Sequence, residues 1–147
     1  MLDPSQIRAI TLDLDDTLWP IWPAIHRAEE VLLLWLKEHA AKTAALFPTS
    51  EALRSIRLQI ERERPDLRHD LSALRRESIA EAMRRAGDDE RLAIPAFDIV
   101  FAQRQQVQLF DDSLPALEFL AQRWPIVAVT NGNADVRALY ATCNCPA

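Results

Sequence analysis

The sequence predicts an α/β fold in which two parallel β-strands are separated by a long helical insertion. An apolar, β-favouring run at residues 7–12 and a second run at 126–129 are interpreted as the strands. Between them, residues 19–108 carry apolar side chains mainly at helical spacing. The chain has two glycines, where average usage would give roughly ten. This scarcity indicates a mostly helical chain, or an α/β domain of which part is absent.

The bulk composition is that of one soluble globular domain. The 147 residues can bury a core, and 49% of them are hydrophobic and 27% charged. A net charge of −5 argues against a general nucleic-acid binder and against a binder of anionic membranes. Residues 1–4 begin without the apolar segment of a signal peptide, and the apolar cluster at 31–36 is too short to span a bilayer. Cys143 and Cys145 lack partners for a zinc site or a disulfide framework, so a cytoplasmic setting is expected.

The first strand ends in a cluster of carboxylates. Residues i and i+2 of a strand share one side, so Asp13 and Asp15 are expected to point to the same place. Two converging like charges cost energy unless a cation or a shared proton lies between them. Magnesium takes hard oxygen ligands from one or two carboxylates, and water and phosphate oxygens complete its shell. The spacing therefore predicts a magnesium site at the end of this strand.

Breaks and caps divide the insertion into helices. Pro23 can open the first helix at its first turn, and Pro65 stops the second. Gly87 can end the third helix in the left-handed conformation. Negative charge after Gly87 suits the start of a fourth helix, which Pro95 is expected to kink or divide. The expected helices cover residues 24–47, a span from the cap at 48–51 to about 64, about 70–86, and about 88–107.

A second α/β segment follows the insertion. Ser113 can cap a helix that runs to about residue 120, ahead of the strand at 126–129. A turn signal at 130–133 ends this strand, and a further helix is expected from residue 134 to about 140. The order of elements is a βαβ pattern with parallel strands. Parallel strands would bring Thr130 and Asp13 to the same carboxyl edge, where open α/β sheets bind ligands.

Two motifs in these segments resemble those of the haloacid dehalogenase-like (HAD) hydrolase superfamily. Residues 13–17 (DLDDT) resemble its first motif, DxDxT, and residues 127–133 (VAVTNGN) are similar to its second, an apolar strand that ends in Thr or Ser. The helical segment between them resembles the cap that this family inserts after the first motif, in a form similar to bacterial flavin-pathway sugar-phosphate phosphatases. The resemblance implies an incomplete Rossmann-like HAD core at 1–18 and 109–147, with a helical cap at 19–108.

The resemblance also implies a role for each motif residue. Asp13 would be the nucleophile that forms an aspartyl-phosphate, and its carboxylate is already ionised at neutral pH. Asp15 would protonate the leaving alkoxide and then deprotonate the attacking water. Both residues would bind Mg²⁺, Asp15 through its backbone carbonyl. Thr130 and the backbone amides around Asn131 and Gly132 would bind the phosphoryl group of a small phosphorylated metabolite.

An acid at position 15 favours phosphate esters over haloacids as substrates. The haloacid dehalogenases of this superfamily are similar but carry a tyrosine there, since a carbon–halogen bond needs no protonation of its leaving group. Dehalogenation is kept as an alternative function. A non-catalytic interaction module, formed by the helical segment alone, is the other.

Parts of the family pattern are missing from this sequence. The family needs a later lysine and a later acidic motif, which balance the charge of the phosphoryl group and complete the magnesium site. Here the last lysine is Lys42, and the only acid after Thr130 is Asp135. Residues 139–147 show neither helical periodicity nor a strand pattern. We therefore expect a C-terminally truncated chain with impaired activity, because losing one such electrostatic group commonly costs about 10²–10³ in rate.

The remaining polar and aromatic residues have simpler interpretations. Asp16 is expected to be a loop residue or a helix-end charge. Trp19 and Trp22 are expected either to pack at a hinge or to line a cleft. The arginines from Arg54 to Arg91 alternate with acids, which is typical of a solvated helical face.

Overall fold

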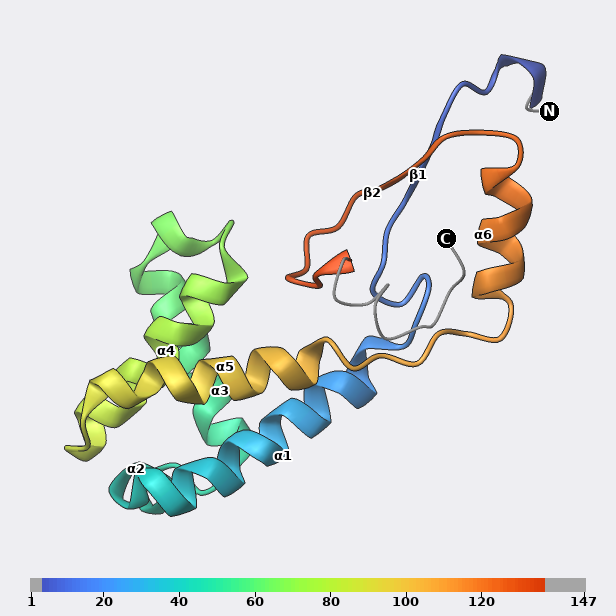
Figure 1. Ribbon diagram of the computed structural model, residues 1–147. Coiled ribbons are helices and arrows are strands. Elements are labelled where there is room, and N and C mark those ends of the chain that lie inside the picture. The colour runs from blue at the N-terminus through green and yellow to red at the C-terminus, as the bar shows by residue number, and fades with distance from the viewer. Residues whose placement is uncertain (1–3, 137–147) are drawn as a thin grey trace. The chain divides into compact units, whose positions relative to one another are not determined.

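The computed structural model describes residues 4–136, and its chain divides into two compact units. The divisions fall between Pro23 and Ala24 and between Gln106 and Val107. The strand unit comprises the described residues before and after these divisions, and the helical unit comprises residues 24–106. Figure 1 shows the strands β1 and β2 in the first and the packed helices of the second. The predicted α/β class, with its helical segment between two parallel strands, is confirmed.

The strand unit contains a short parallel sheet. β1 (Ile10–Leu12) and β2 (Ile126–Ala128) pair in register from end to end. The Val129 amide donates to the Leu12 carbonyl at 2.8 Å, which extends the pairing past β2. α6 (Ser113–Ala121) lies between the strands in sequence, and a short 3₁₀ turn (Pro4–Gln6) precedes β1.

The strands are shorter and more exposed than the sequence predicts. Both apolar runs were expected to be buried, but Thr11 is exposed, and Val127 and Val129 are 52% and 58% exposed. The described part of the sheet is two-stranded, so little covers the apolar side chains of β2. The core of this unit instead forms around Leu14 and Trp19, which lie just beyond β1 and are each 3% exposed.

The predicted cap at Ser113 is wrong. α6 begins at this residue, Asp112 occupies the N-cap position, and Asp112 makes no side-chain capping bond. The Ser113 hydroxyl donates to the backbone carbonyl of Leu18 at 2.8 Å. Its hydrogen-bonding capacity is thus used for a long-range contact, which fixes the start of α6 to the loop that follows β1.

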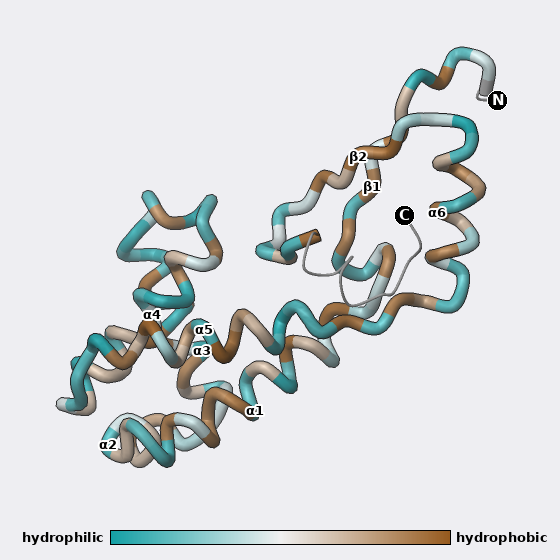
Figure 2. Tube along the Cα trace, in the orientation of Figure 1, coloured by the Kyte–Doolittle hydropathy of each residue, from teal (hydrophilic) through white to brown (hydrophobic). Residues whose placement is uncertain are grey.

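The helical unit is built from five α-helices and two short 3₁₀ turns among its described residues. Its core consists of apolar side chains from α1, α4 and α5, and Figure 2 shows how hydrophobic and hydrophilic residues alternate along these helices. Leu36, Ala82, Met83 and Ala96 are completely buried there. The elements are α1 (Ile21–His39), α2 (Ala41–Leu46), α3 (Ser50–Glu63), η2 (Pro65–Leu67), α4 (Leu71–Ala86), η3 (Glu90–Leu92) and α5 (Ala93–Arg104).

Most of the predicted breaks lie where the sequence placed them. Asp70 accepts a bond from the Ala73 amide and caps α4, and Gly87 ends α4 with a φ of 78°. The helix expected over about 88–107 is divided just before Pro95, into η3 and α5, and Pro95 lies in the first turn of α5, where a missing amide costs nothing. The single helix expected over 24–47 is wrong, because Ala40 has a φ of −143° and separates α1 from α2. No helix among residues 4–136 is long and apolar enough to cross a membrane.

Thr43 and Asp88 join α2 to the segment that follows α4. The backbone amide and the hydroxyl of Thr43, a fully buried residue, both donate to Asp88 Oδ2, at 2.7 and 2.8 Å. Partial burial disfavours the Asp88 carboxylate, but these two bonds and the charge of Lys42 outweigh it and hold the pKa of Asp88 below its usual value. The contact therefore contributes stability when Asp88 is ionised.

Replacing Thr43 with valine is expected to reduce the acid sensitivity of the helical unit. A depressed carboxyl pKa adds stability that is present above the ordinary value of about 3.9 and is lost as pH falls through the folded-state pKa. The T43V variant keeps the side-chain volume but loses one donor, so it should be less stable by about 1 kcal/mol at pH 7 and by less at pH 3. Urea unfolding at the two pH values measures both differences. Equal losses at pH 7 and pH 3 would contradict the role of Asp88.

Candidate functional site

The candidate site lies at the carboxyl edge of the two-stranded sheet, within the strand unit. Asp13 directly follows β1, and Thr130 follows β2 by two residues. The register places Leu12 beside Ala128, so both strands end at the same edge. The two motifs that are far apart in sequence therefore leave their strands side by side, as the βαβ pattern predicts.

Asp13 and Asp15 differ in their surroundings. Asp13 is exposed, and its carboxylate accepts no hydrogen bond from residues 4–136. Asp15 is half-buried, and its Oδ1 accepts a hydrogen bond from Trp19 Nε1 at 2.9 Å. The indole thus holds one carboxylate in position while the other is open to solvent, which suits a fixed acid–base group beside an accessible nucleophile.

The loop between β1 and α1 turns back on itself to make this contact possible. The Leu18 amide donates to the Leu14 carbonyl at 2.8 Å, and the Asp16 amide donates to the Trp19 carbonyl at 2.8 Å. Asp16 has a φ of 57°, the left-handed conformation that Asp tolerates better than most residues. Its Oδ1 accepts a bond from the Ile21 amide at 2.9 Å, at the start of α1. Asp16 is thus a loop residue whose carboxylate bonds to the start of α1, which agrees with the prediction of a loop residue or a helix-end charge.

The second motif forms a turn after β2. The Gly132 amide donates to Thr130 Oγ1 at 3.0 Å, while Thr130 is half-buried and Asn131 is exposed. One amide predicted to face a phosphoryl group is therefore bonded to the threonine hydroxyl, whose oxygen can still donate its own proton. The expected start of a helix at residue 134 is wrong, because residues 133–135 are not helical and Val136 is the first helical residue; the continuation to about 140 lies outside the described residues.

The carboxyl edge of the sheet offers two carboxylates, those of Asp13 and Asp15, as ligands for a metal ion. Within residues 4–136 no group of three or more His, Cys, Asp or Glu side chains is placed to hold a metal ion. Magnesium does not need such a cage, since it is usually bound by one or two carboxylates together with water and phosphate oxygens. The oxygen donors of Asp13 and Asp15 fit that requirement.

Sequence reasoning missed the part that Trp19 plays. It left open whether Trp19 packs at a hinge or lines a cleft, and the residue is in fact 3% exposed and packs against Leu14. The four-residue spacing between Asp15 and Trp19 is a weak sequence signal for their hydrogen bond. Trp22, which lies in the first turn of α1, is 56% exposed.

Comparison with known proteins identifies relatives over nearly the whole chain. A family model described as haloacid dehalogenase-like hydrolase matches residues 7–143. The chain is 33% identical over 135 residues to the 5-amino-6-(5-phospho-D-ribitylamino)uracil phosphatase YigB of Escherichia coli, covering 89% of this chain and 56% of that protein. The chain thus spans a little over half the length of this curated relative.

Solved structures share the same fold. A structure described as 2-haloacid dehalogenase from Pseudomonas syringae is 42% identical, with a TM-score of 0.82, and the match covers 92% of this chain and 60% of that one. The HAD-hydrolase YfnB from Bacillus subtilis, described as bound to magnesium, is 16% identical with a TM-score of 0.55 over 90% of this chain and 56% of that chain. At that identity the second likeness shows the fold alone.

Proposed function

The chain belongs to the haloacid dehalogenase-like hydrolases, and from that premise we propose that it carries the nucleophile half of a magnesium-dependent phosphatase. The observation that carries the proposal is the placement of Asp13, Asp15 and Thr130 at one edge of the parallel sheet. In this proposal residues 1–18 and 109–147 belong to the catalytic core, and residues 19–108 form the cap that follows the first motif.

Asp13 is the nucleophile in the proposed reaction. One of its carboxylate oxygens forms a bond to phosphorus while the bond from phosphorus to the ester oxygen breaks. Asp15, held by Trp19, gives its proton to that leaving oxygen. Asp15 then takes a proton from water, whose oxygen attacks phosphorus and displaces Asp13. Inorganic phosphate leaves, and both carboxyl groups return to their starting states.

The other residues of the edge bind and orient the phosphoryl group. The Thr130 hydroxyl donates to one of its oxygens, with backbone amides near Asn131 and Gly132 beside it. Mg²⁺ held by the Asp13 carboxylate and the Asp15 backbone carbonyl would neutralise charge on the transferring group.

A small phosphorylated metabolite is the substrate class that we propose. The name of the E. coli relative specifies a phosphate ester of a ribityl compound. An acidic residue at position 15 supports the same class, because an alkoxide leaving group needs a proton and a halide does not. The name of the P. syringae structure keeps dehalogenation as the second candidate.

The phosphatase and the dehalogenase candidates can be distinguished by their products. We expect the purified chain to form a Mg²⁺-dependent covalent phosphoryl adduct with p-nitrophenyl phosphate, visible by mass spectrometry after acid quench. We expect no chloride release from 2-chloropropionate under the same conditions, and EDTA should abolish the adduct. Chloride release without a phosphoryl adduct would favour the dehalogenase, and the absence of both products would contradict phosphoryl transfer by this chain.

A further inference from the structure

The helical unit contains a pocket of its own, lined by residues of α1, α3 and α4. The space between its lining residues is about 350 Å³, and this value includes open solvent. Its polar lining consists of Glu29, Arg54, Arg57, Arg75 and the hydroxyls of Ser50 and Ser78. Every lining residue lies within residues 24–106, so the pocket is formed by the helical unit alone.

The charges of this pocket do not balance. It is lined by three arginines and one carboxylate, that of Glu29. Both oxygens of Glu29 are engaged by Arg54, whose Nε and Nη2 donate to them at 2.9 and 2.6 Å. Glu29 is 6% exposed, so this bidentate pair is largely removed from water. The single carboxylate is thus occupied by one guanidinium and leaves two more in the lining.

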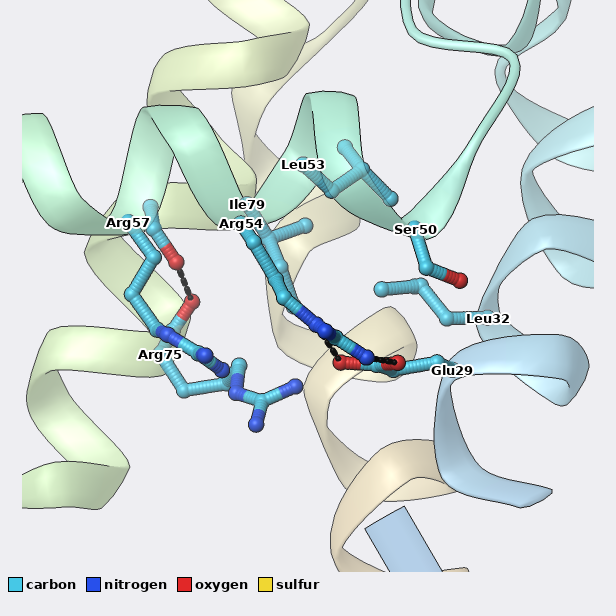
Figure 3. Close-up of a pocket in the computed structure, with 9 residues that line it drawn as sticks. Glu29, Leu32, Ser50, Leu53, Arg54, Arg57, Arg75 and Ile79 are labelled. Carbon is cyan, nitrogen blue, oxygen red and sulfur yellow. Dashed lines mark hydrogen bonds and ion pairs between the residues drawn. The ribbon is translucent and has the colours of Figure 1, made fainter. Parts of the chain in front are cut away.

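Arg57 and Arg75 are the two remaining cations. In Figure 3 their guanidinium groups lie near each other and extend toward the Arg54–Glu29 pair. Among residues 4–136 neither guanidinium makes a hydrogen bond or has a carboxylate within ion-pair distance. Glu29 and, for Arg57, Glu61 act on them only as more distant charges. The expectation that these arginines lie on a solvated helical face is wrong for this part of the insertion.

The surroundings of Arg57 and Arg75 disfavour their charge. Burial and the repulsion between neighbouring arginines lower the pKa of Arg75 to about 10, and burial lowers the pKa of Arg57. A cation that is partly removed from water without a hydrogen-bonded counter-charge costs free energy. Two such cations side by side would be stabilised by an anion placed between them.

Guanidinium geometry specifies the kind of anion. Arginine presents planar, forked N–H donors that match the oxygens of a phosphate or carboxylate group. The Ser50 hydroxyl, at the first residue of α3, adds a further donor to the lining. The Ser78 hydroxyl already donates to the Arg75 carbonyl at 2.8 Å, and this contact helps to fix the backbone of α4 beside the pocket.

We propose that this pocket of the helical unit binds an oxyanion, carried by a phosphate or carboxylate group, through Arg57 and Arg75. The Arg54–Glu29 pair then forms the rigid wall against which the anion is held. This inference does not depend on the proposed phosphatase reaction, because none of the strand-unit residues takes part in it.

Inorganic phosphate and acetate are the two probes that test the proposal. Isothermal titration calorimetry of the 147-residue chain, at constant ionic strength with chloride as the replaced anion, should show saturable binding of at least one of them. Phosphate binding alone identifies a phosphate site, and acetate binding alone identifies a carboxylate site. No saturable binding of either probe would overturn the proposal.

Arginine variants separate the pocket from other anion sites. R57M and R75M should each weaken binding of the probe by about tenfold or more, because each removes charged hydrogen bonds. R62M, which removes an exposed arginine of α3, should leave the affinity unchanged. T130V should leave unchanged the part of the binding that R57M and R75M weaken. Binding that survives in R75M but is lost in T130V belongs to the strand edge and would overturn the proposal.

Thermal unfolding separates a binding role from a structural one. If Arg57 and Arg75 serve a ligand, removing either relieves repulsion, and the Tm of the R57M and R75M chains without ligand should stay the same or rise. Both chains should also lose the rise in Tm that the bound probe gives to the wild type. A fall in the Tm of both variants with unchanged probe affinity would show that the arginines are structural and would contradict the proposal.

Discussion

Replacing Asp13 with asparagine is expected to abolish formation of the covalent phosphoryl adduct. Asparagine has nearly the same shape, but its amide oxygen is a poor nucleophile and carries no charge. Loss of a nucleophile commonly lowers turnover by about 10⁴-fold or more, so the rate should fall to the background of the assay. Mass spectrometry of the quenched chain, with p-nitrophenyl phosphate and Mg²⁺, measures the adduct directly.

Asp16 provides the matched control for this substitution. In D16N the asparagine tolerates the left-handed backbone and can still accept the bond from the Ile21 amide. The D16N chain should therefore form the adduct at a rate close to that of the wild type. An adduct that forms equally in D13N would assign the nucleophile to another residue.

Replacing Glu29 with glutamine is expected to lower the free energy of unfolding more than either T43V or E30Q does. The substitution removes the only carboxylate that lines the pocket with three arginines, and it breaks the bidentate contact with Arg54. Breaking a buried pair costs about 3–5 kcal/mol, and the partial exposure of Arg54 reduces this to about 2–3 kcal/mol. Urea denaturation of both chains at pH 7 measures the difference.

E30Q is the control for E29Q, and combining E29Q with R75M tests whether the loss of stability is electrostatic. Glu30 is exposed on the same helix, so E30Q should change the free energy of unfolding by no more than about 0.5 kcal/mol. Adding R75M to E29Q should recover part of the loss, because one of the unbalanced cations is removed. Purely additive effects in this double-mutant cycle would contradict electrostatic coupling between Glu29 and Arg75.

The main features of the fold could be read from local patterns. Apolar runs at 7–12 and 126–129 contain the observed strands, and Pro65 and Gly87 mark the ends of helices α3 and α4. These signals act through the backbone: proline lacks an amide proton, and glycine adopts a positive φ at little cost. The separation of α1 from α2 was not predicted, because Thr43 of α2 is fixed by Asp88, which lies 45 residues away.

The candidate site was predictable in position but not in detail. The spacing of Asp13 and Asp15, together with a second strand ending in Thr130, was enough to place them at one sheet edge. The hydrogen bond between Trp19 and Asp15 depends on how residues 14–19 turn back, and no periodic pattern encodes that turn. The arginine-lined pocket also depends on tertiary packing, since it combines side chains from α1, α3 and α4.

The contact between Trp19 and Asp15 gives the site an intrinsic optical probe. The indole Nε1–H is bonded to the carboxylate, and the ring is almost completely shielded from water. Indole absorption and emission respond to charge placed at the ring nitrogen, so loss or gain of a proton at Asp15 should shift the Trp19 signal. A chain in which the other tryptophans are replaced by phenylalanine would report the state of Asp15 by fluorescence, without any added label.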